Sequence, residues 1–509
     1  MKLLSLLGAA IPSFRTARAF AADAAGQIPQ FALAADLLRP QFHLLPKRNW
    51  MNDPNGPIYW NGNYHMFFQY NPNAAVWGDM HWNHTVSPDM IHWKHLPVAL
   101  GPTTGGYDTD GCFSGSGVIH RGTAHFLYTG VQSVPAAQAT LRDGAHNFRE
   151  VVALATSRDP QLLKLEKFPE PVILPPDEPR IAGFRDPFLW QQDQVWYLGI
   201  GSGLYGEGGR VLLYRSSDLQ HWEALDHPLA SGKRTDAQAS NPVAAGEMWE
   251  CPDFFALGDK HLLFYSTAGK VFWESGEFDS KELVFHAQKR GVLDHGNYYA
   301  PKSQLAPDNR RILWGWIPET RPEAEFSAAG WSGSMSLPRV LSIDNDGNLV
   351  IDFAEETESL RGALWSLPGP DNPAARRDAL RNFQLDRPSA ELALRFGSEP
   401  FELRLGTDDA TIFSIAYHPQ NSGKELEIAG HVVPLAPRTA GGHELRLFLD
   451  ASVLEAIVNR SIAVTARVYR TWNAPMRLRI TESFDSSLGS VSALDCWTIN
   501  PISSDRLTT

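Results

Sequence analysis

The stretch Ser87-Pro-Asp-Met-Ile-His-Trp93 returns later in the chain as Ser216-Ser-Asp-Leu-Gln-His-Trp222, and a degenerate copy begins at Ser157-Arg-Asp159. A shared pattern in distant segments indicates an internal repeat. A generic β-sandwich, whose strands resemble one another only in composition, does not explain a common Ser-x-Asp-x-x-His-Trp sequence. The fold is therefore expected to contain repeated units of similar structure.

A second repeat lies in the strands around these copies. Short runs rich in aromatic and aliphatic residues alternate with Gly, Pro, Asn and Asp turns, which is typical of β-structure. One such strand recurs at intervals of roughly 50 to 70 residues, the scale of a propeller blade. Five units of about four strands each predict a five-bladed β-propeller with inner strands around a central channel. The five copies of the strand are Tyr64–Phe68, Ala124–Tyr128, Val195–Leu198, Lys260–Phe264 and Arg311–Trp314.

The repeat ends near residue 345, and the composition changes there. We expect the propeller over residues 40–345, a linker rich in Pro, Gly, Ala and Arg within 346–378, and a β-sandwich over 379–505. Alternating strands such as Glu444–Leu449 support the sandwich. The predicted fold class is thus all-β, a five-bladed β-propeller followed by a C-terminal β-sandwich.

The overall charge restricts the classes of partner that the protein is expected to bind. The 509 residues carry a formal net charge of −12 and no Lys/Arg-rich run, whereas nucleic acids and anionic membranes require a basic patch. A neutral substrate fits this balance better. None of the three cysteines belongs to a cluster with zinc-ligand spacing, so we expect no metal and no cofactor. The oligomeric state stays open.

The N-terminus resembles an export signal. An apolar run from Leu3 to Ile11 is followed by small residues in A-x-A arrangements, although two arginines after the run are atypical. We expect residues 1–24 to be a signal peptide, which would make the protein secreted or periplasmic.

Three acidic motifs precede recurring strands at a similar distance. Asp53, Asp186 and Glu250 lie 10 to 12 residues before the strand in the first, third and fourth units. Phe113–Ser116 takes the corresponding place in the second unit and Tyr299-Ala300 in the fifth. If these positions are equivalent, the three carboxylates converge on one mouth of the channel.

Converging carboxylates without metal ligands suit glycoside hydrolysis. One acid protonates the leaving oxygen while a second carboxylate attacks carbon or activates water. Mutual repulsion raises one pKa, so that one group is protonated beside an ionised neighbour. Taken alone, each motif also reads as a turn, because Asp-Pro and Asn-Gly are common turn sequences. Three motifs in phase with one repeat favour the catalytic interpretation.

Together, these motifs resemble glycoside hydrolase family 32, which includes invertases, inulinases, levanases and fructan exohydrolases. The resemblance spans about residues 40 to 500 and implies a propeller with a β-sandwich. It rests on Trp50–Gly56, Phe113–Ser116, Arg185–Pro187, Glu250–Asp253, Trp331–Gly333 and Ser336–Arg339.

The resemblance implies a role for each motif residue. Asp53 would be the nucleophile, Glu250 the acid/base, and Asp186 the group that stabilises the transition state through ring hydroxyls. Asp450-x-Ser452-x-x-Glu455 resembles a sandwich motif of the family, and its strand-and-turn pattern reads as structural. Trp77 could instead belong to the core, and Gln69 could instead satisfy a strand edge. The substrate-binding residues implied are Trp50, Asn52, Gln69, Trp77, Phe113, Ser114, Arg185, Tyr299 and Trp316.

Three other functions use similar residues. A fructosyltransferase would share the nucleophile and acid/base but pass the fructosyl unit to a sugar; Trp50 resembles the hydrolases. A catalytically inactive fructan-binding protein would not need all three carboxylates. An inverting propeller glycosidase is disfavoured by the complete Trp50–Gly56 block. We therefore expect a retaining hydrolase that releases fructose from sucrose or a fructan, with substrate preference and exo or endo cleavage undecided.

Overall fold

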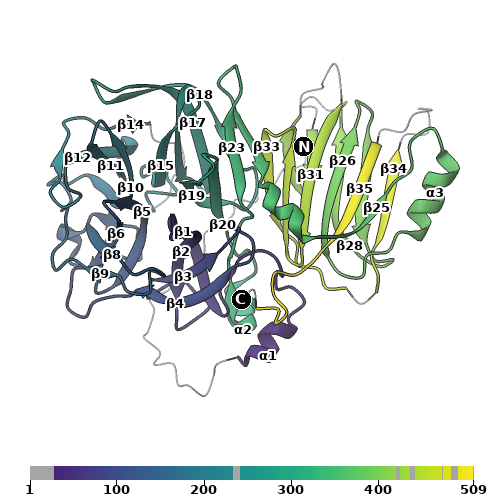
Figure 1. Cartoon of the computed structure of the whole chain (residues 1–509), viewed down its shortest axis with the longest axis horizontal. Coiled ribbons are helices and arrows are strands. Elements are labelled where there is room, and N and C mark those ends of the chain that lie inside the picture. The colour runs from purple at the N-terminus through teal and green to yellow at the C-terminus, as the bar shows by residue number, and fades with distance from the viewer. Residues whose placement is uncertain are drawn as a thin grey trace, which may run out of the picture.

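The described part of the chain forms seven β-sheets and a few short helices (Figure 1). The computed structural model describes residues 28–232, 241–419, 425–435, 442–472, 474–482 and 491–507. The predicted signal peptide at residues 1–24 lies outside these residues. Five of the sheets form a β-propeller and two form a β-sandwich, as the sequence predicts.

Each blade is an antiparallel sheet built outward from the channel. Blade 1 contains β1 (Asn49–Trp60), β2 (Asn63–Asn71), β3 (His81–Ser87) and β4 (Lys94–Leu100). Blade 2 contains β5 (Gly111–His120), β6 (Thr123–Ser133), β7 (Leu141–Arg142), β8 (Asn147–Ser157) and β9 (Glu166–Lys167), with 3-10 helix η2 (Ala136–Gln138) between β6 and β7. Blade 3 contains β10 (Ile181–Gln192), β11 (Val195–Leu204), β12 (Gly208–Ser216), β13 (Glu223–Ala224) and β14 (Ala230–Ser231).

The last two blades follow the same plan. Blade 4 contains β15 (Glu250–Leu257), β16 (Lys260–Thr267), β17 (Lys270–Asp279) and β18 (Val284–Val292). Blade 5 contains β19 (Tyr299–Leu305), β20 (Arg311–Ile317), β22 (Ser334–Met335), β23 (Arg339–Ile343) and β24 (Leu349–Phe353). Two short helices, α1 (Gln30–Ala35) and α2 (Glu323–Ala329), lie below the blades in Figure 1.

The recurring strand of the sequence is the second strand of every blade, namely β2, β6, β11, β16 and β20. Its side chains are buried on both faces because each blade packs between two others, which explains the near-continuous apolar runs. The strand before it is the inner one. The inner strands β1, β5, β10, β15 and β19 contact one another in this order around the channel, and their labels surround the centre of the propeller in Figure 1.

The ring closes through a short parallel ladder. Strand β21 (Trp331–Ser332) pairs with β1, with Trp331 opposite Asn49 and Ser332 opposite Trp50. The end of the propeller sequence thereby completes the first blade. The indole of Trp331 is fully buried, and its Nε1 donates a 2.7 Å hydrogen bond to Asp36.

The Ser-x-Asp-x-x-His-Trp repeat forms the same turn after the third strand of blades 1 and 3. In blade 1, Asp89 accepts the backbone N–H of His92 at 2.8 Å and lies 2.7 Å from its Nδ1. In blade 3, Asp218 and His221 repeat this geometry at 2.8 and 2.8 Å. An aspartate three residues before a histidine thus ties the turn at two points.

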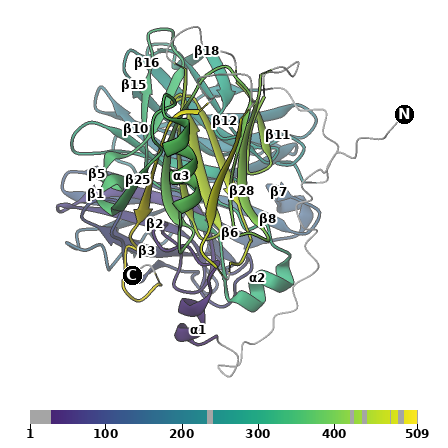
Figure 2. The ribbon, with the colours of Figure 1, turned by 90° about the vertical axis from the view of Figure 1, so that its right-hand side faces the viewer.

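The two sheets of the sandwich face each other across one apolar core. The first sheet has the order β25 (Arg361–Ser366), β35 (Val491–Ile499), β26 (Ser389–Phe396), β31 (His443–Asp450), β32 (Val453–Val458) and β33 (Ile462–Arg467). The second has the order β30 (His431–Pro434), β29 (Glu425–Ile428), β28 (Thr411–His418), β27 (Phe401–Gly406) and β34 (Arg477–Glu482). Figure 2 shows this sandwich in front of the blades.

The expected linker at 346–378 contains regular structure instead. Strand β24 pairs with β23 and so extends blade 5 to Phe353. The 3-10 helix η3 (Glu355–Leu360) follows, and β25 is an edge strand of the sandwich. The Pro- and Ala-rich stretch begins helix α3 (Pro373–Asn382), with Asn372 as its N-cap and proline at its first position. That composition marks a helix start rather than a free connection.

A buried charged network joins the two domains. Asp450 accepts the backbone N–H groups of Gln41, Phe42 and His43 at 2.7, 2.8 and 2.9 Å. The His43 ring lies between two carboxylates, with Nδ1 2.9 Å from Asp450 and Nε2 3.0 Å from Glu455. The Asp450-x-x-x-x-Glu455 motif thus binds the segment that leads into blade 1, in agreement with its structural interpretation.

Glu455 also reaches blade 5. Its Oε2 accepts hydrogen bonds from Arg339, whose Nη1 donates to Asp294 at 2.9 Å. Apolar side chains surround these ions, because Phe448 and Ile457 of the sandwich pack with Leu313 and Phe353 of blade 5. The propeller and sandwich therefore share one continuous interface. Within the described residues, no helix is long and apolar enough to span a membrane.

Candidate active site

The inner strands are interrupted at the same level in each blade. In β10, three steps from Arg185 to Phe188 face two steps on β11, and the same bulge separates Glu250 from Asp253 in β15. Strands β1 and β19 have it after Met51 and Tyr299. A bulge turns side chains away from the regular alternation of a strand. Here it directs polar residues into the channel mouth.

The three acids occupy successive positions of this bulge rather than one equivalent position. Glu250 is the last paired residue before it, Asp186 is its first unpaired residue, and Asp53 is its second. The premise of strict equivalence was therefore too simple, although the acids still meet.

The meeting place is a cavity of about 250 Å³ at the channel mouth. Eleven of the twelve site residues predicted from the sequence line it. They are Asn52, Asp53, Gln69, Trp77, Phe113, Ser114, Arg185, Asp186, Glu250, Tyr299 and Trp316. Five lining residues were not predicted, namely Leu141, Asp143, His146, Phe148 and Asn241.

Asp53 is held by donors on both carboxyl oxygens. Asn52 Nδ2 donates to Oδ1 at 3.0 Å, and Ser114 Oγ donates to Oδ2 at 2.7 Å. Burial raises the pKa of Asp53, with a smaller contribution from Glu250, while these hydrogen bonds act in the opposite direction. Gly115 allows strand β6 to approach, since a Cβ there would lie 2.0 Å from the carbonyl oxygen of Leu127.

Asp186 lies beside Asp53, and Cys251 links the two. The Cys251 Sγ is 3.4 Å from Asp53 Oδ2 and 3.5 Å from Asp186 Oδ2, and its backbone N–H donates to Asp186 at 2.9 Å. Burial raises the pKa of Asp186 to about 7, against the opposing effect of the Arg185 guanidinium. Cys251 is buried and packs between two of the acids.

Glu250 is held from two sides. Arg185 Nη2 donates to Oε1 at 2.8 Å, and Tyr299 Oη donates to Oε2 at 2.8 Å. Burial, together with the charge of Glu250, raises the pKa of Tyr299 well above its usual value, so the phenol stays protonated and serves as a donor. The side chain of Glu250 is 21% exposed, more than those of Arg185 and Asp186 at 7% and 3%.

A further carboxylate, Glu150, orients Arg185 from behind. Its Oε1 accepts from Arg185 Nη1 at 2.7 Å, and its Oε2 accepts from the backbone N–H of Phe184 and from Thr140 Oγ1 at 2.7 and 2.8 Å. Glu150 is fully buried. The sequence analysis missed it, because no motif or repeat surrounds it in β8.

Aromatic rings form the opposite wall of the cavity. Trp77 and Phe113 meet edge to face at 5.8 Å, and His146 lies 5.4 Å from Trp77 and stacks on Phe148 at 4.9 Å. Trp77 is half-buried and Gln69 is buried, with its Nε2 donating to the Cys112 carbonyl at 3.0 Å. Both residues line the cavity while also packing within the blade.

Trp50 is the predicted residue that does not line the cavity. Its Nε1 donates to Asn52 Oδ1 at 2.7 Å, and its ring lies 5.8 Å from that of Trp316. It acts on the cavity by fixing Asn52, which in turn holds Asp53.

His146 is positioned by the turn that the sequence repeat describes. Asp143 accepts the backbone N–H groups of Ala145 and His146 at 2.8 and 2.6 Å and lies 3.1 Å from the ring Nδ1. This is the Asp-x-x-His arrangement of Asp89 and Asp218. The spacing Asp143-Gly-Ala-His146 was therefore a signal that could have identified this part of the wall.

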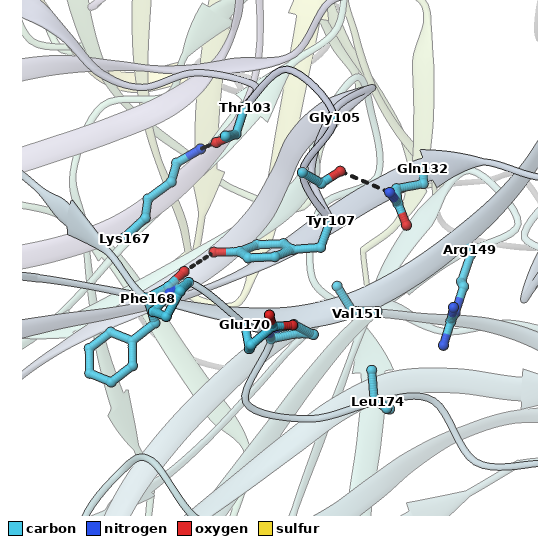
Figure 3. A pocket seen from close by; sticks show the side chains of 13 residues that line it. Thr103, Gly105, Tyr107, Gln132, Arg149, Val151, Lys167, Phe168, Glu170 and Leu174 are labelled. Atoms are coloured by element: carbon cyan, nitrogen blue, oxygen red, sulfur yellow. Dashed lines mark hydrogen bonds between the residues drawn. The ribbon is translucent and has the colours of Figure 1, made fainter.

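A second hollow of about 590 Å³ lies along blade 2 and is drawn in Figure 3. Two of its polar side chains bond to the protein backbone: Tyr107 Oη donates to the Phe168 carbonyl at 2.7 Å and Gln132 Nε2 to the Gly106 carbonyl at 2.8 Å. Lys167 is paired with Asp108. Glu170 is the one carboxylate among its lining residues, so the hollow does not provide the paired acids of the first cavity.

A propeller with three carboxylates at its channel mouth defines a glycosidase site. Residues 43–352 match the model of the glycosyl hydrolases family 32 N-terminal domain. The chain is 35% identical over 469 residues to sucrose-6-phosphate hydrolase of Escherichia coli, with 84% of this chain and 89% of that protein covered. The chain belongs to glycosyl hydrolase family 32.

Two further comparisons agree. Raffinose invertase of Escherichia coli is 35% identical over 462 residues, with 84% of this chain and 89% of that protein covered. The structure of fructan 1-exohydrolase IIa from Cichorium intybus in complex with 1-kestose superposes with a TM-score of 0.75 at 26% identity, covering 91% and 98% of the two chains. The protein is therefore a glycosidase that hydrolyses a carbohydrate.

Proposed function

We propose that the protein hydrolyses β-fructofuranosides with retention of configuration and releases fructose from sucrose or from fructans. The observation that carries this proposal is the meeting of three carboxylates in one cavity, where Asp53 and Asp186 share Cys251 and Glu250 is oriented by Arg185 and Tyr299. The names of the relatives favour transfer of the fructosyl unit to water over transfer to a sugar.

In the first step, Asp53 Oδ attacks the anomeric carbon of the fructosyl unit. The bond from that carbon to the leaving oxygen breaks, and Glu250 donates its proton to that oxygen. The products are a covalent fructosyl ester on Asp53 and the leaving sugar with a free hydroxyl group. Ser114 and Asn52 hold the attacking carboxylate in place, which lowers the entropic cost of attack.

In the second step, Glu250 takes a proton from water, and the water oxygen attacks the same carbon. The ester bond breaks and returns the carboxylate of Asp53. Asp186 is placed to accept hydrogen bonds from ring hydroxyls, which strengthen as oxocarbenium character develops. The aromatic wall supplies apolar faces for the C–H surfaces of the sugar.

The experiment combines product analysis with stereochemistry. Purified protein is incubated with sucrose, raffinose, inulin and levan, the products are separated by chromatography, and early products are followed by proton NMR. We expect fructose whose first-formed anomer is β. Initial release of the α anomer would contradict retention. Transfer products in place of free fructose would contradict hydrolysis. A carboxyl separation of roughly 5–5.5 Å between Asp53 and Glu250 remains the matching structural prediction.

Export is proposed on the N-terminal sequence alone. Fractionation of cells that produce the full chain, followed by N-terminal sequencing of the mature protein, tests whether residues 1–24 are removed.

A further inference from the structure

The hollow along blade 2 lies directly beside the active-site cavity. Phe148 lines the cavity, and Arg149, the next residue of β8, lines the hollow. Successive side chains of a strand point to opposite faces, so a single strand separates the two spaces. Arg149 lies opposite Gln132 of β6, which also lines the hollow. An extended ligand that leaves the cavity over the start of β8 would therefore enter the hollow.

Two charged side chains in this hollow have no partner within the protein. Among the residues that the structure describes, neither the Arg149 nor the Glu170 side chain has a hydrogen-bond or ion-pair partner. Arg149 is nevertheless half-buried, although charged groups taken out of water are ordinarily paired. Arg142, at the same end of the blade, donates to four backbone carbonyls at 2.8 to 3.4 Å. The donors of Arg149 and the acceptors of Glu170 are thus available to a ligand.

The surface between these charges is aromatic and aliphatic. Figure 3 shows the Tyr107 ring extending across the hollow toward Phe168, with Arg149 on the opposite side. The 2.7 Å bond from Tyr107 Oη to the Phe168 carbonyl fixes the ring in this position. Leu174 also lines the hollow and is 55% exposed. Apolar faces with a few donors and acceptors at their margin suit sugar rings, whose C–H surfaces need the former and whose hydroxyls need the latter.

The two charges favour an uncharged occupant. Arg149 and Glu170 carry opposite charges, and Lys167 is already paired with Asp108. An ion of either sign would be attracted by one side chain and repelled by the other, whereas sugar hydroxyls can accept from the guanidinium and donate to the carboxylate. The hollow measures about 590 Å³ against about 250 Å³ for the cavity. It therefore offers more space for a sugar chain than the cavity does.

We propose that the hollow along blade 2 is a second carbohydrate-binding site, which holds distal units of a fructan while the end of the same chain occupies the cavity. This inference rests on the proposed function and specifies the substrates that gain from the site, namely chains of several units. Binding in the hollow raises the effective concentration of chain ends at the cavity. Sucrose is too short to occupy both places, so its hydrolysis does not depend on the hollow.

Rates on sucrose, long-chain inulin and levan test this dependence. Glu170 lies in the loop after β9, so Glu170→Gln removes the charged acceptor without changing β8 or the lining of the cavity. Glu170→Gln and Arg149→Gln should each raise KM for at least one of the two fructans about three- to tenfold, because the gain in effective concentration is lost. The kcat values and the sucrose parameters should stay unchanged. Glu166→Gln, an exposed change in the same blade outside the hollow, is the matched control.

Binding without turnover provides a second measurement. Asp53→Asn protein is run through native gels that contain inulin or levan, beside the same protein with Glu170→Gln added. We expect the fructan to retard the Asp53→Asn protein, and the retardation to weaken several-fold in the double variant. This measurement needs no hydrolysis, and Glu170 is an exposed residue, so the result stands even if Arg149→Gln folds poorly.

The outcomes separate the second site from the proposed function. Equal rises of KM for sucrose and for the fructans would overturn the second site, since the substitutions would then act on the cavity. Unchanged KM for both fructans together with unchanged retardation would overturn it as well. Altered sedimentation of Glu170→Gln without altered fructan binding would assign the hollow to contacts between copies of the chain instead. Hydrolysis of none of the sugars would refute the proposed function, whereas retardation that depends on Glu170 would still support the binding site.

Discussion

Glu150 Oε1 lies 2.7 Å from Arg185 Nη1, on the side of the guanidinium away from Glu250. This pair fixes the position of Glu250, the proposed acid/base. Arg185 bonds both to Glu150, which is fully buried, and to Glu250, which lines the cavity. An arginine with a single partner could rotate, whereas one held at both ends keeps Glu250 in one place.

Glu150→Gln should fold but lower kcat by roughly 10- to 100-fold, since small displacements of catalytic groups have effects of this size. Because Glu150 acts through Arg185 on Glu250, the loss should be smaller on a fructoside with a good leaving group, which needs little protonation. Rates on sucrose and on that fructoside provide the measurement. Glu166→Gln, an exposed change in the same blade, should alter neither rate. An equal loss on both substrates would show that Glu150 does not act through Glu250.

Asp53→Ala and Glu250→Ala should each lower kcat on sucrose by several orders of magnitude. The two should differ on a fructoside with a good leaving group, which needs little protonation. On that substrate Glu250→Ala should recover much of its fructosylation rate and Asp53→Ala none. Circular dichroism beside the rates checks the fold. A folded Asp53→Ala protein with near-normal turnover would refute the assignment of the nucleophile.

Ser114→Ala should move the acid limb of the activity profile upward. Asp53 must be ionised to attack, and burial already raises its pKa. The 2.7 Å bond from Ser114 stabilises the ionised form, and a charged hydrogen bond contributes about 1.5–3 kcal/mol, or roughly one to two pH units. The acid limb of kcat/KM should shift by at least about half of that range. A limb that stays in place would mean that Ser114 does not control the charge of Asp53.

Asp186→Asn should lower kcat and raise the stability of the folded protein. The pKa of Asp186 is about 7 in the folded protein against an ordinary value of 3.8. The folded state thus holds a proton that the unfolded state releases between these values, so stability falls as pH rises from about 4 to 7. Because asparagine does not titrate, the Asp186→Asn protein does not undergo this loss of stability, which is at most about 4 kcal/mol. Thermal unfolding should show a gain for Asp186→Asn that is larger at pH 8 than at pH 4, together with a loss of kcat. A gain independent of pH would contradict this explanation.

The domain interface should weaken at alkaline pH. Both ring nitrogens of His43 face carboxylates, which only the imidazolium can satisfy by donating twice. Burial alone disfavours that charge, but Asp450 and Glu455 raise the pKa of His43 to about 8. Its contribution of about 2 kcal/mol is complete below pH 6.5 and is lost as pH rises through 8.

Unfolding measured between pH 6 and 9 should therefore show a fall in stability that His43→Gln reduces. His286→Gln, which changes an exposed histidine in blade 4, should retain the fall. Equal slopes in all three proteins would exclude His43 as its origin.

The repeated strand made the propeller predictable, because identical packing in each blade imposes the same side chains at the same places. It also placed Asp53, Asp186 and Glu250, since each lies in a bulge just before that strand. Glu150 and Thr140 could not be found in this way. Glu150 acts on Arg185 of the next blade, Thr140 acts on Glu150, and an isolated glutamate in an apolar strand has no local pattern to identify it. The linker prediction failed for a related reason, because proline and alanine favour both a helix start and a loop.

The pairing of β1 with β21 has a consequence for biosynthesis. Trp50 leaves the ribosome about 280 residues before its partner Ser332, a delay of roughly 15 to 60 s at usual rates of translation. Asp450, which fastens the segment before β1, is made later still. In the nascent chain, β1 therefore lacks its partner β21 until most of the polypeptide has emerged, and the cavity can form only after that. A product truncated before Trp331 would lack the closed ring, and one truncated before Asp450 would lack the bonds that fasten the segment before β1.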